Sequence, residues 1–201
     1  DDGHPEIVVL EAGGDTGRTF VAAGWHSDVT WRAEPSMGSI LRGVIVPPYG
    51  GDTCFANACA AYQRLSDEWK ERVDNLVAVH DYMRVFSDRV APAEREAMRE
   101  TYPAQHHPVI RTHPETGRKS LYIGMHTSHI EGISEIEGKN LLDELLEAAT
   151  TSKNIYRHKW QSGDLVLWDN RCLLHRGDKN FKMDKHRRIL HRTVVKGTVP
   201  F

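Results

Sequence analysis

The chain has 201 residues, of which 39% are hydrophobic and 27% charged, and its formal net charge is −2. This length and composition predict a globular protein with one sizeable core, and they argue against binding to nucleic acid or to a membrane through bulk charge. No apolar run approaches the ~18 residues that a membrane span needs, and no signal peptide is visible. Three cysteines without CxxC spacing fit a reducing compartment, so we expect a cytoplasmic protein.

In the first half of the chain, short β-prone runs alternate with turns, and helices follow them. Asn57 and Ser66 are good N-caps for helices that begin just after them. The expected strands span residues 7–10, 39–46, 53–55 and 76–80, and the first expected helix spans 58–65. Residues 83–107 lack strand alternation, and two interpretations stay open for them: a mobile lid with one short helix, or a solvated surface excursion.

The second half of the chain predicts two hairpins, one helix and a final strand. Residues 108–124 and 155–170 each place a turn between two β-prone runs, and 187–197 is a β-branched strand. The run SEIE at 134–137 is a capping box that opens a helix with an apolar stripe. The stripe consists of Ile136, Leu141, Leu142, Leu145, Leu146 and Ala149. Strands in adjacent pairs predict a mainly β fold with flanking helices (α+β), as a sandwich or barrel, and not a parallel βαβ fold.

The stretch GWHSDV contains His26 and Asp28 two positions apart. On a strand, residues i and i+2 point to the same face, so one strand can direct an imidazole and a carboxylate at one point. This would suit a divalent metal, but the pattern occurs often by chance, and alone it favours an ordinary polar patch. Ser27, between the two, is expected to face away and to be structural.

A third candidate ligand follows in LVLWDNRCLLHRG, residues 165–177. Its apolar start, Leu165 to Leu167, is expected in the core, and His175 lies near its end. Two histidines and one carboxylate on one face of a metal leave three positions open, which is the arrangement of non-haem Fe(II) oxygenases. Trp168 is expected to pack near this site as a core aromatic.

The run HRRILHRT places two arginines, Arg188 and Arg192, on one face of a strand together with Leu190. Arginines rarely turn inward unless they meet an anion, so this face would suit two carboxylate-like ligands held by bidentate pairs. The alternative is a basic, solvated strand end, which the nearby lysines favour for the neighbouring positions.

Together these motifs resemble the taurine/2-oxoglutarate dioxygenase family of Fe(II)-dependent oxygenases. The matching stretches are WHSDVTW, SILRGVIVPPYGGDTCFANACAAYQRL, HPETGRKSLYIG, GDLVLWDNRCLLHR and RRILHRTVV, and the resemblance extends from Pro5 to Phe201. The family pattern is H-x-D, a distant His and then an Arg; here His175 comes 147 positions after Asp28, and Arg188 comes 13 after His175. The resemblance implies a double-stranded β-helix (jelly-roll) barrel, as one catalytic domain over 1–201 that lacks about 70 residues of the family's N-terminal part.

The same resemblance implies an activity and a role for each motif. The activity is that of an Fe(II)/2-oxoglutarate-dependent dioxygenase, which uses Fe(II), 2-oxoglutarate and O₂ to hydroxylate a small anionic substrate and releases succinate. His26, Asp28 and His175 would bind Fe(II). Thr53 and Arg188 would bind the distal carboxylate of 2-oxoglutarate, and Arg192 the anionic group of the substrate. Family members often form dimers or tetramers, so we expect a homo-oligomer, without a nucleic-acid or membrane partner.

The residues before the H-x-D motif bear on the substrate. Taurine-specific members place a polar amide about four residues before the first His, where this chain has Ala22. A pocket wall of Val21, Ala22 and Ala23 suits an apolar substrate body, so aryloxyalkanoates or alkyl sulfates fit at least as well as a sulfonate such as taurine. Two other functions stay open: a zinc-dependent hydrolase with the same three ligands, and a non-catalytic β-barrel that binds small anions.

Most other histidines are expected to be bystanders. His106, His107, His113 and His129 fall in expected loops or turns, and His186 and His191 fall on the strand face opposite Arg188. His80 and His158 have no assigned role, and His126 lies in a loop that could approach the pocket.

Overall fold

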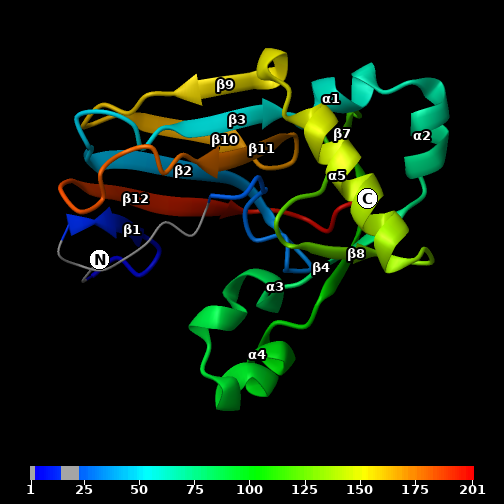
Figure 1. Ribbon diagram of the computed structural model, residues 1–201, viewed down its shortest axis with the longest axis horizontal. Helices are drawn as coiled ribbons and strands as arrows, with labels where there is room; N and C mark the ends of the chain where they lie inside the picture. The colour runs from blue at the N-terminus through cyan, green and yellow to red at the C-terminus, as the bar shows by residue number, and fades with distance from the viewer. Residues whose placement is uncertain (1–2, 15–22) are drawn as a thin grey trace.

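The computed structural model describes residues 3–14 and 23–201, and its strands pair antiparallel in several sheets (Figure 1). The largest sheet, of order β1-β12-β2-β10, contains β1 (Val8–Gly13), β12 (Arg187–Lys196), β2 (Ser36–Ile45) and β10 (Leu165–Asp169). A second sheet, of order β11-β3-β9, contains β11 (Leu173–Gly177), β3 (Thr53–Asn57) and β9 (Ile155–His158). The fold is mainly β with helices, as predicted, and the described strands form separate sheets without a closed barrel.

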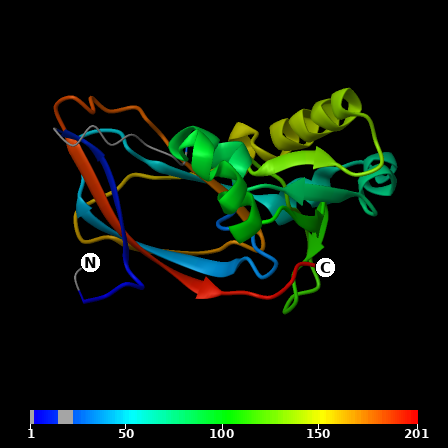
Figure 2. The same ribbon diagram turned by 90° about the horizontal axis from the view of Figure 1, so that it is seen from below.

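These two sheets enclose one apolar cluster. Leu41, Trp168 and Leu190 come from the larger sheet, Phe55 comes from β3, and Trp160 comes from the segment between β9 and β10. Figures 1 and 2 show both sheets in one half of the molecule, with most of the helices in the other. The cluster fixes β3, β11 and β12 relative to one another, and these strands carry most of the predicted site residues.

A second core fills the other half. Its strands are β4 (Val77–His80), β5 (Gln105–Pro108) and β8 (Thr127–Ile130) in one sheet, and the hairpin β6 (Ile110–Thr112) and β7 (Lys119–Leu121). Its helices are α1 (Ala58–Arg64), α2 (Asp67–Val73) and α5 (Glu135–Ala149). Apolar side chains from these elements, β5 excepted, pack together, including Val73, Leu141 and Leu145, and Leu174 of β11 joins them. None of the described helices is long and apolar enough to cross a membrane.

The helices begin where the sequence predicts. Asn57, Ser66 and Ser134 each accept a side-chain hydrogen bond from the backbone N–H three positions further on, at 2.8 to 3.3 Å. Each cap satisfies one of the N–H groups that the first turn of a helix leaves without an intrahelical partner. The hairpin expected at 108–124 is also confirmed, as the pair β6 and β7.

Residues 83–107 hold more regular structure than the single short helix of the lid interpretation. They contain α3 (Met83–Phe86) and α4 (Arg95–Thr101), 3₁₀ turns at Ser87–Arg89 and Pro92–Glu94, and most of β5. A proline is well tolerated in a first helical turn because its missing N–H would have no helical partner there. Figure 1 shows α3 and α4 projecting beside the sheets. Movement of this segment as a lid stays a prediction.

The predicted hairpin at 155–170 is wrong. β9 pairs with β3 whereas β10 pairs with β2, so the chain crosses from one sheet to the other between them. The tight turn itself is present, and Gly163 supplies the positive φ of 91°. Trp160 occupies the core between the sheets, and this tertiary contact carries the segment across.

Three apolar residues expected in the core are exposed instead: Ile136 to 77%, and Leu165 and Leu167 to 63% each. β10 is an edge strand with one face toward solvent, so only its alternate residues, Val166 and Trp168, face the apolar cluster. Ile136 lies in the first turn of α5, whereas the later members of its stripe pack into the second core as predicted.

Replacing Leu145 by alanine is expected to lower the free energy of unfolding by about 2–5 kcal/mol, because it leaves a cavity in the second core. Ile136→Ala truncates an aliphatic side chain of the same helix that lies largely in water, so it should change this free energy by at most about 0.5 kcal/mol. Urea unfolding measures both variants. Equal losses would contradict the packing described for α5.

His80 of β4 is only 1% exposed, and burial, with His107 and His126 nearby, lowers its pKa from 6.5 to about 3. Between these two values the unfolded chain binds a proton that the folded protein does not, so stability falls as the pH falls through this window. His80→Phe should reduce the slope of the unfolding free energy between pH ~4 and ~6 by about 1.4 kcal/mol per pH unit. His129→Gln, at an exposed ring on β8, is the control, and an unchanged slope in His80→Phe would contradict the assignment.

Candidate metal centre

His26, Asp28 and His175 meet at one buried point, although they come from distant parts of the sequence. His26 and His175 exchange two backbone hydrogen bonds, of 3.0 and 2.7 Å, which form an isolated β-bridge along the edge strand β11 of the second sheet. One possible ligand atom from each of the three side chains lies within 4.8 Å of the other two. All three side chains are buried, so the structure brings together the residues that the sequence pattern singles out.

The backbone around Asp28 differs from the strand that we predicted. His26 makes the single bridge, and Asp28 begins a turn in which Val29 has a positive φ of 59°. This conformation is strained for a β-branched residue and is held by the surrounding contacts. Ser27 is buried, and its hydroxyl donates to the Leu173 carbonyl at 3.0 Å, in agreement with its expected structural role.

The hydrogen bond of His26 fixes the protonation of its ring. Nδ1 lies 2.8 Å from the Gly24 carbonyl oxygen, which can only accept, so Nδ1 carries the proton and Nε2 keeps its lone pair. Nε2 of His26 and Nε2 of His175 lie 3.9 and 3.7 Å from the two carboxylate oxygens of Asp28. The two rings therefore direct nitrogen atoms toward the carboxylate from two sides.

A polar network holds the Asp28 carboxylate in place. Ser39 Oγ donates to Oδ2 at 2.6 Å, and Arg192 Nη1 donates to Oδ1 at 3.0 Å. Asn170 accepts from the Asp28 backbone N–H and from the Trp168 indole, and its amide donates to Ser39 Oγ. Burial raises the pKa of Asp28, but His175, Arg192 and His26 outweigh it and lower the pKa to about 2. The carboxylate is thus ionised at neutral pH.

The two histidines are neutral at the same pH. Burial lowers the pKa of His175 to about 3, and it also lowers the pKa of His26. A neutral imidazole keeps a lone pair for a metal, so the donor set is two nitrogen atoms and one anionic oxygen. This set fits a divalent transition metal such as iron or zinc.

Thr53 and Arg188 form a second polar cluster between the two sheets. Arg188 is 5% exposed; its Nε donates to the Gly51 carbonyl at 2.9 Å, and its Nη2 lies 3.4 Å from Thr53 Oγ1. Arg188 and Arg192 leave β12 on the same inward face, as predicted, with Leu190 buried between them. Burial lowers the pKa of Arg188 to about 10, so the guanidinium stays charged.

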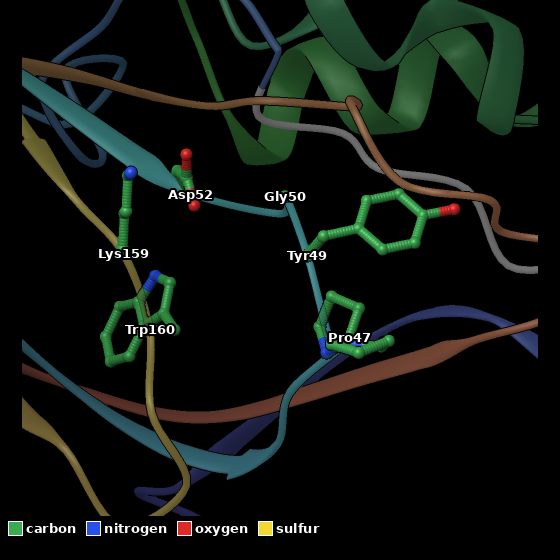
Figure 3. A pocket seen from close by; sticks show the side chains of 7 residues that line it. Pro47, Tyr49, Gly50, Asp52, Lys159 and Trp160 are labelled. Atoms are coloured by element: carbon green, nitrogen blue, oxygen red, sulfur yellow. The ribbon is translucent and has the colours of Figure 1, made fainter.

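A hollow of about 370 Å³ lies beside this cluster (Figure 3). It is lined by Pro47, Pro48, Tyr49, Gly50, Asp52, Lys159 and Trp160. Figure 3 shows Trp160 and Lys159 facing Pro47 and Tyr49 across it. None of the three candidate metal ligands lines the hollow. Trp160 joins the hollow to the Thr53–Arg188 cluster, because its indole N–H donates to Thr53 Oγ1 at 2.9 Å.

Trp31, Phe86 and His126 form an aromatic wall next to the candidate ligands, and little in the sequence pointed to it. The His126 ring centroid lies 6.0 Å from that of His26, 4.5 Å from that of Trp31 and 5.8 Å from that of Phe86. These residues come from the 126 loop, the turn after Asp28 and α3, so no local pattern links them. The one local signal for the wall was that Trp31 is itself the last residue of the WHSDVTW motif. Of the other wall that we predicted, Val21 and Ala22 lie outside the described residues, and Ala23 is half-buried.

Several of the remaining histidines have structural partners, and His186 lies just before β12 and not on the strand face that we expected. His106, His107 and His129 lie in strands and not in the loops that we expected, and the His107 ring bonds the carbonyls of Thr30 and Arg32. His113, Asp169 and Cys172 also form a cluster with metal-binding atom types. However, His113 Nδ1 accepts from two turn N–H groups, so Nε2 carries the proton and donates to Asp169, which also pairs with Arg171. This cluster is a closed polar network.

The sequence matches the family model of the taurine catabolism dioxygenase TauD, TfdA family, over residues 1–194. It is 41% identical to an alpha-ketoglutarate-dependent 2,4-dichlorophenoxyacetate dioxygenase of Cupriavidus pinatubonensis, over 87% of this chain and 61% of that protein. It is 34% identical to an alpha-ketoglutarate-dependent sulfate ester dioxygenase of Pseudomonas putida, over 98% of this chain and 69% of that protein. A solved taurine dioxygenase from Burkholderia xenovorans has a TM-score of 0.83 and 35% identity, over 100% of this chain and 67% of that one.

The chain spans about three fifths of the length of the Cupriavidus relative. Within that span, the sequence match and the structural match cover nearly all of the chain, including both halves of the candidate centre. The chain belongs to the TauD/TfdA family of dioxygenases.

Proposed function

We propose that this chain carries the catalytic domain of an Fe(II)- and 2-oxoglutarate-dependent dioxygenase that hydroxylates a C–H of a small anionic substrate. The observation that carries the proposal is the buried set of two neutral histidines and one ionised aspartate, with ligand atoms within 4.8 Å of one another, in a TauD/TfdA family chain. We further infer that its two facing sheets belong to the jelly-roll barrel of the family, and that the assembled protein is a homo-oligomer.

In this proposal His26, Asp28 and His175 hold Fe(II). The bound Fe(II), with 2-oxoglutarate and O₂, would supply the oxidising chemistry that converts 2-oxoglutarate to succinate and CO₂ and hydroxylates the substrate. The protein contributes placement: Ser39 and Asn170 hold the carboxylate, and the Gly24 carbonyl holds the His26 tautomer. Such supporting hydrogen bonds orient metal ligands and tune their basicity.

Arg188 and Thr53 are proposed to hold the distal carboxylate of 2-oxoglutarate. Arg188 is 5% exposed, and an arginine is seldom buried unless its place suits an anion. Its Nε bond to the Gly51 carbonyl fixes the plane of the guanidinium. Gly51 permits this arrangement, because a Cβ there would lie 3.1 Å from Arg188 Cδ. Thr53 adds a hydroxyl at the same place.

Arg192 is proposed to hold the anionic group of the substrate. Its Nη1 pairs with Asp28, while its buried Nε has no hydrogen-bond partner among the described residues. A buried donor without a partner carries a free-energy cost that an anionic ligand would remove. The side chain is also 26% exposed, so a ligand can approach it from outside.

The aromatic wall favours a substrate with a ring or an apolar chain. The His126 ring lies edge-on to His26, and Trp31 and Phe86 pack against each other and against His126, so we propose that an aryl group stacks on this side of the site. Aryloxyalkanoates and sulfate esters, the substrates in the names of the relatives, join such a body to an anion. We therefore propose 2,4-dichlorophenoxyacetate-like acids as better substrates than taurine.

The wild-type chain with Fe(II), 2-oxoglutarate, ascorbate and O₂ should release succinate, faster with 2,4-dichlorophenoxyacetate than with an alkyl sulfate or taurine. His26→Ala and His175→Ala should abolish succinate release and weaken Mn(II) binding more than about 100-fold, because each removes a ligand. His191→Gln, on the other face of β12, is the control for both measurements.

A zinc hydrolase or an anion-binding barrel would give no succinate from 2-oxoglutarate. If none of these three substrates gave succinate, and His26→Ala left Mn(II) binding unchanged, the dioxygenase proposal would be contradicted.

Substitutions of Arg188 and Arg192 are expected to affect the KM values of different ligands. Arg188→Gln should raise the KM for 2-oxoglutarate about 10- to 100-fold, because it removes a charged partner of the carboxylate. Arg192→Gln should raise the KM for 2,4-dichlorophenoxyacetate by a similar factor and change the KM for 2-oxoglutarate little. Steady-state succinate release measures both constants, and equal effects of each variant on the two constants would contradict the division of roles.

A further inference from the structure

The indole of Trp160 is packed between the two sheets. A Cβ at Gly43 of β2 would lie 3.3 Å from Trp160 Cε3, so the ring lies directly over the backbone of that strand. The His158 ring lies edge-on to the Trp160 ring at a centroid distance of 4.6 Å, and Trp160 is only 7% exposed. These contacts determine where the indole N–H points, and it points at Thr53 Oγ1, 2.9 Å away.

The partners of the Thr53 hydroxyl determine its direction. A hydroxyl has one proton to donate and two lone pairs that accept. Thr53 Oγ1 accepts from the Trp160 indole at 2.9 Å and lies 3.4 Å from Arg188 Nη2, and both of these groups can only donate. With both lone pairs facing donors, the O–H proton of Thr53 is left to donate to a third group.

We propose that Trp160 is a positioning residue for 2-oxoglutarate, which acts by turning the Thr53 hydroxyl into an oriented donor beside Arg188. The inference rests on the proposed function. The nearby Asp52 carboxylate already pairs with Arg157 at 3.1 Å, and the Nε of Arg188 already donates to Gly51. The Thr53 O–H, directed as a donor beside the positive charge of Arg188, suits a group that only accepts, which is what an ionised carboxylate is. Trp160 thus contributes selectivity for a cosubstrate with a distal carboxylate without touching it.

The test is equilibrium binding of 2-oxoglutarate to the Mn(II)-loaded protein, by calorimetry, in the wild type and in Trp160→Phe. Phenylalanine keeps a planar ring in the core but removes the N–H, so 2-oxoglutarate affinity should fall about tenfold. Binding of 2-oxopentanoate, which lacks the distal carboxylate, should be weak and unchanged. In turnover, KM for 2-oxoglutarate should rise while kcat stays nearly constant. Trp69→Phe, in α2, is the matched control.

Two further measurements separate positioning from general damage to the core. In a Thr53→Val background, which has no hydroxyl to orient, Trp160→Phe should cause no additional loss of 2-oxoglutarate affinity, whereas in Thr53→Ser it should cause the full loss. In the wild type with Zn(II), the Trp160 indole N–H resonance should shift on adding 2-oxoglutarate and not on adding 2-oxopentanoate. This second measurement does not depend on any variant folding.

Unchanged 2-oxoglutarate affinity in Trp160→Phe, equal losses for both 2-oxo acids, or additive losses in the Thr53→Val background would each overturn the role of Trp160. Failure of the wild type to bind 2-oxoglutarate would instead overturn the proposed function. The two failures are therefore distinguishable from the same titrations.

Discussion

The register between β3 and β11 is the constraint on which the rest of the candidate site depends. In this register His175 lies opposite Phe55 and Gly177 lies opposite Thr53. One pair of strands therefore places both a candidate metal ligand, His175, and a candidate carboxylate-binding residue, Thr53. His175, in the middle of β11, also exchanges two backbone hydrogen bonds with His26, which brings Asp28 to the same place. A shift of one residue would turn every side chain of β11 to the other face and separate the clusters.

Electrostatics then determines what this geometry can bind. Asp28 is 3% exposed, and such a carboxylate persists as an anion only because donors and positive charge surround it. The neighbouring imidazoles stay neutral, because burial lowers their pKa values. The result is one negative charge with two neutral nitrogen donors, next to two guanidinium groups on β12. A cation and two anions, held in one place, would complement this distribution.

Local patterns predicted much of this arrangement, and tertiary contacts account for what they missed. The helix caps at Asn57, Ser66 and Ser134 and the inward face of Arg188 depend on a few neighbouring residues, so the sequence was enough to predict them. The hairpin at 155–170 was wrong because Trp160 packs between sheets that the local turn signal cannot indicate. The aromatic wall and the Asn170 network were missed because their members come from segments far apart in sequence. The roles assigned to the site residues stay predictions.

The pairing of β12 has a consequence for how the protein folds. This strand lies between β1 and β2 in the sheet, so strands from the two ends of the described chain are neighbours. Such pairing gives the sheet contacts of high sequence separation, which close slowly, and during synthesis β12 is made after all its partners. Arg188 and Arg192 both lie on β12, so the positively charged side of the site is assembled last. A partly folded chain therefore has the Asp28 carboxylate before it has the guanidinium that compensates it.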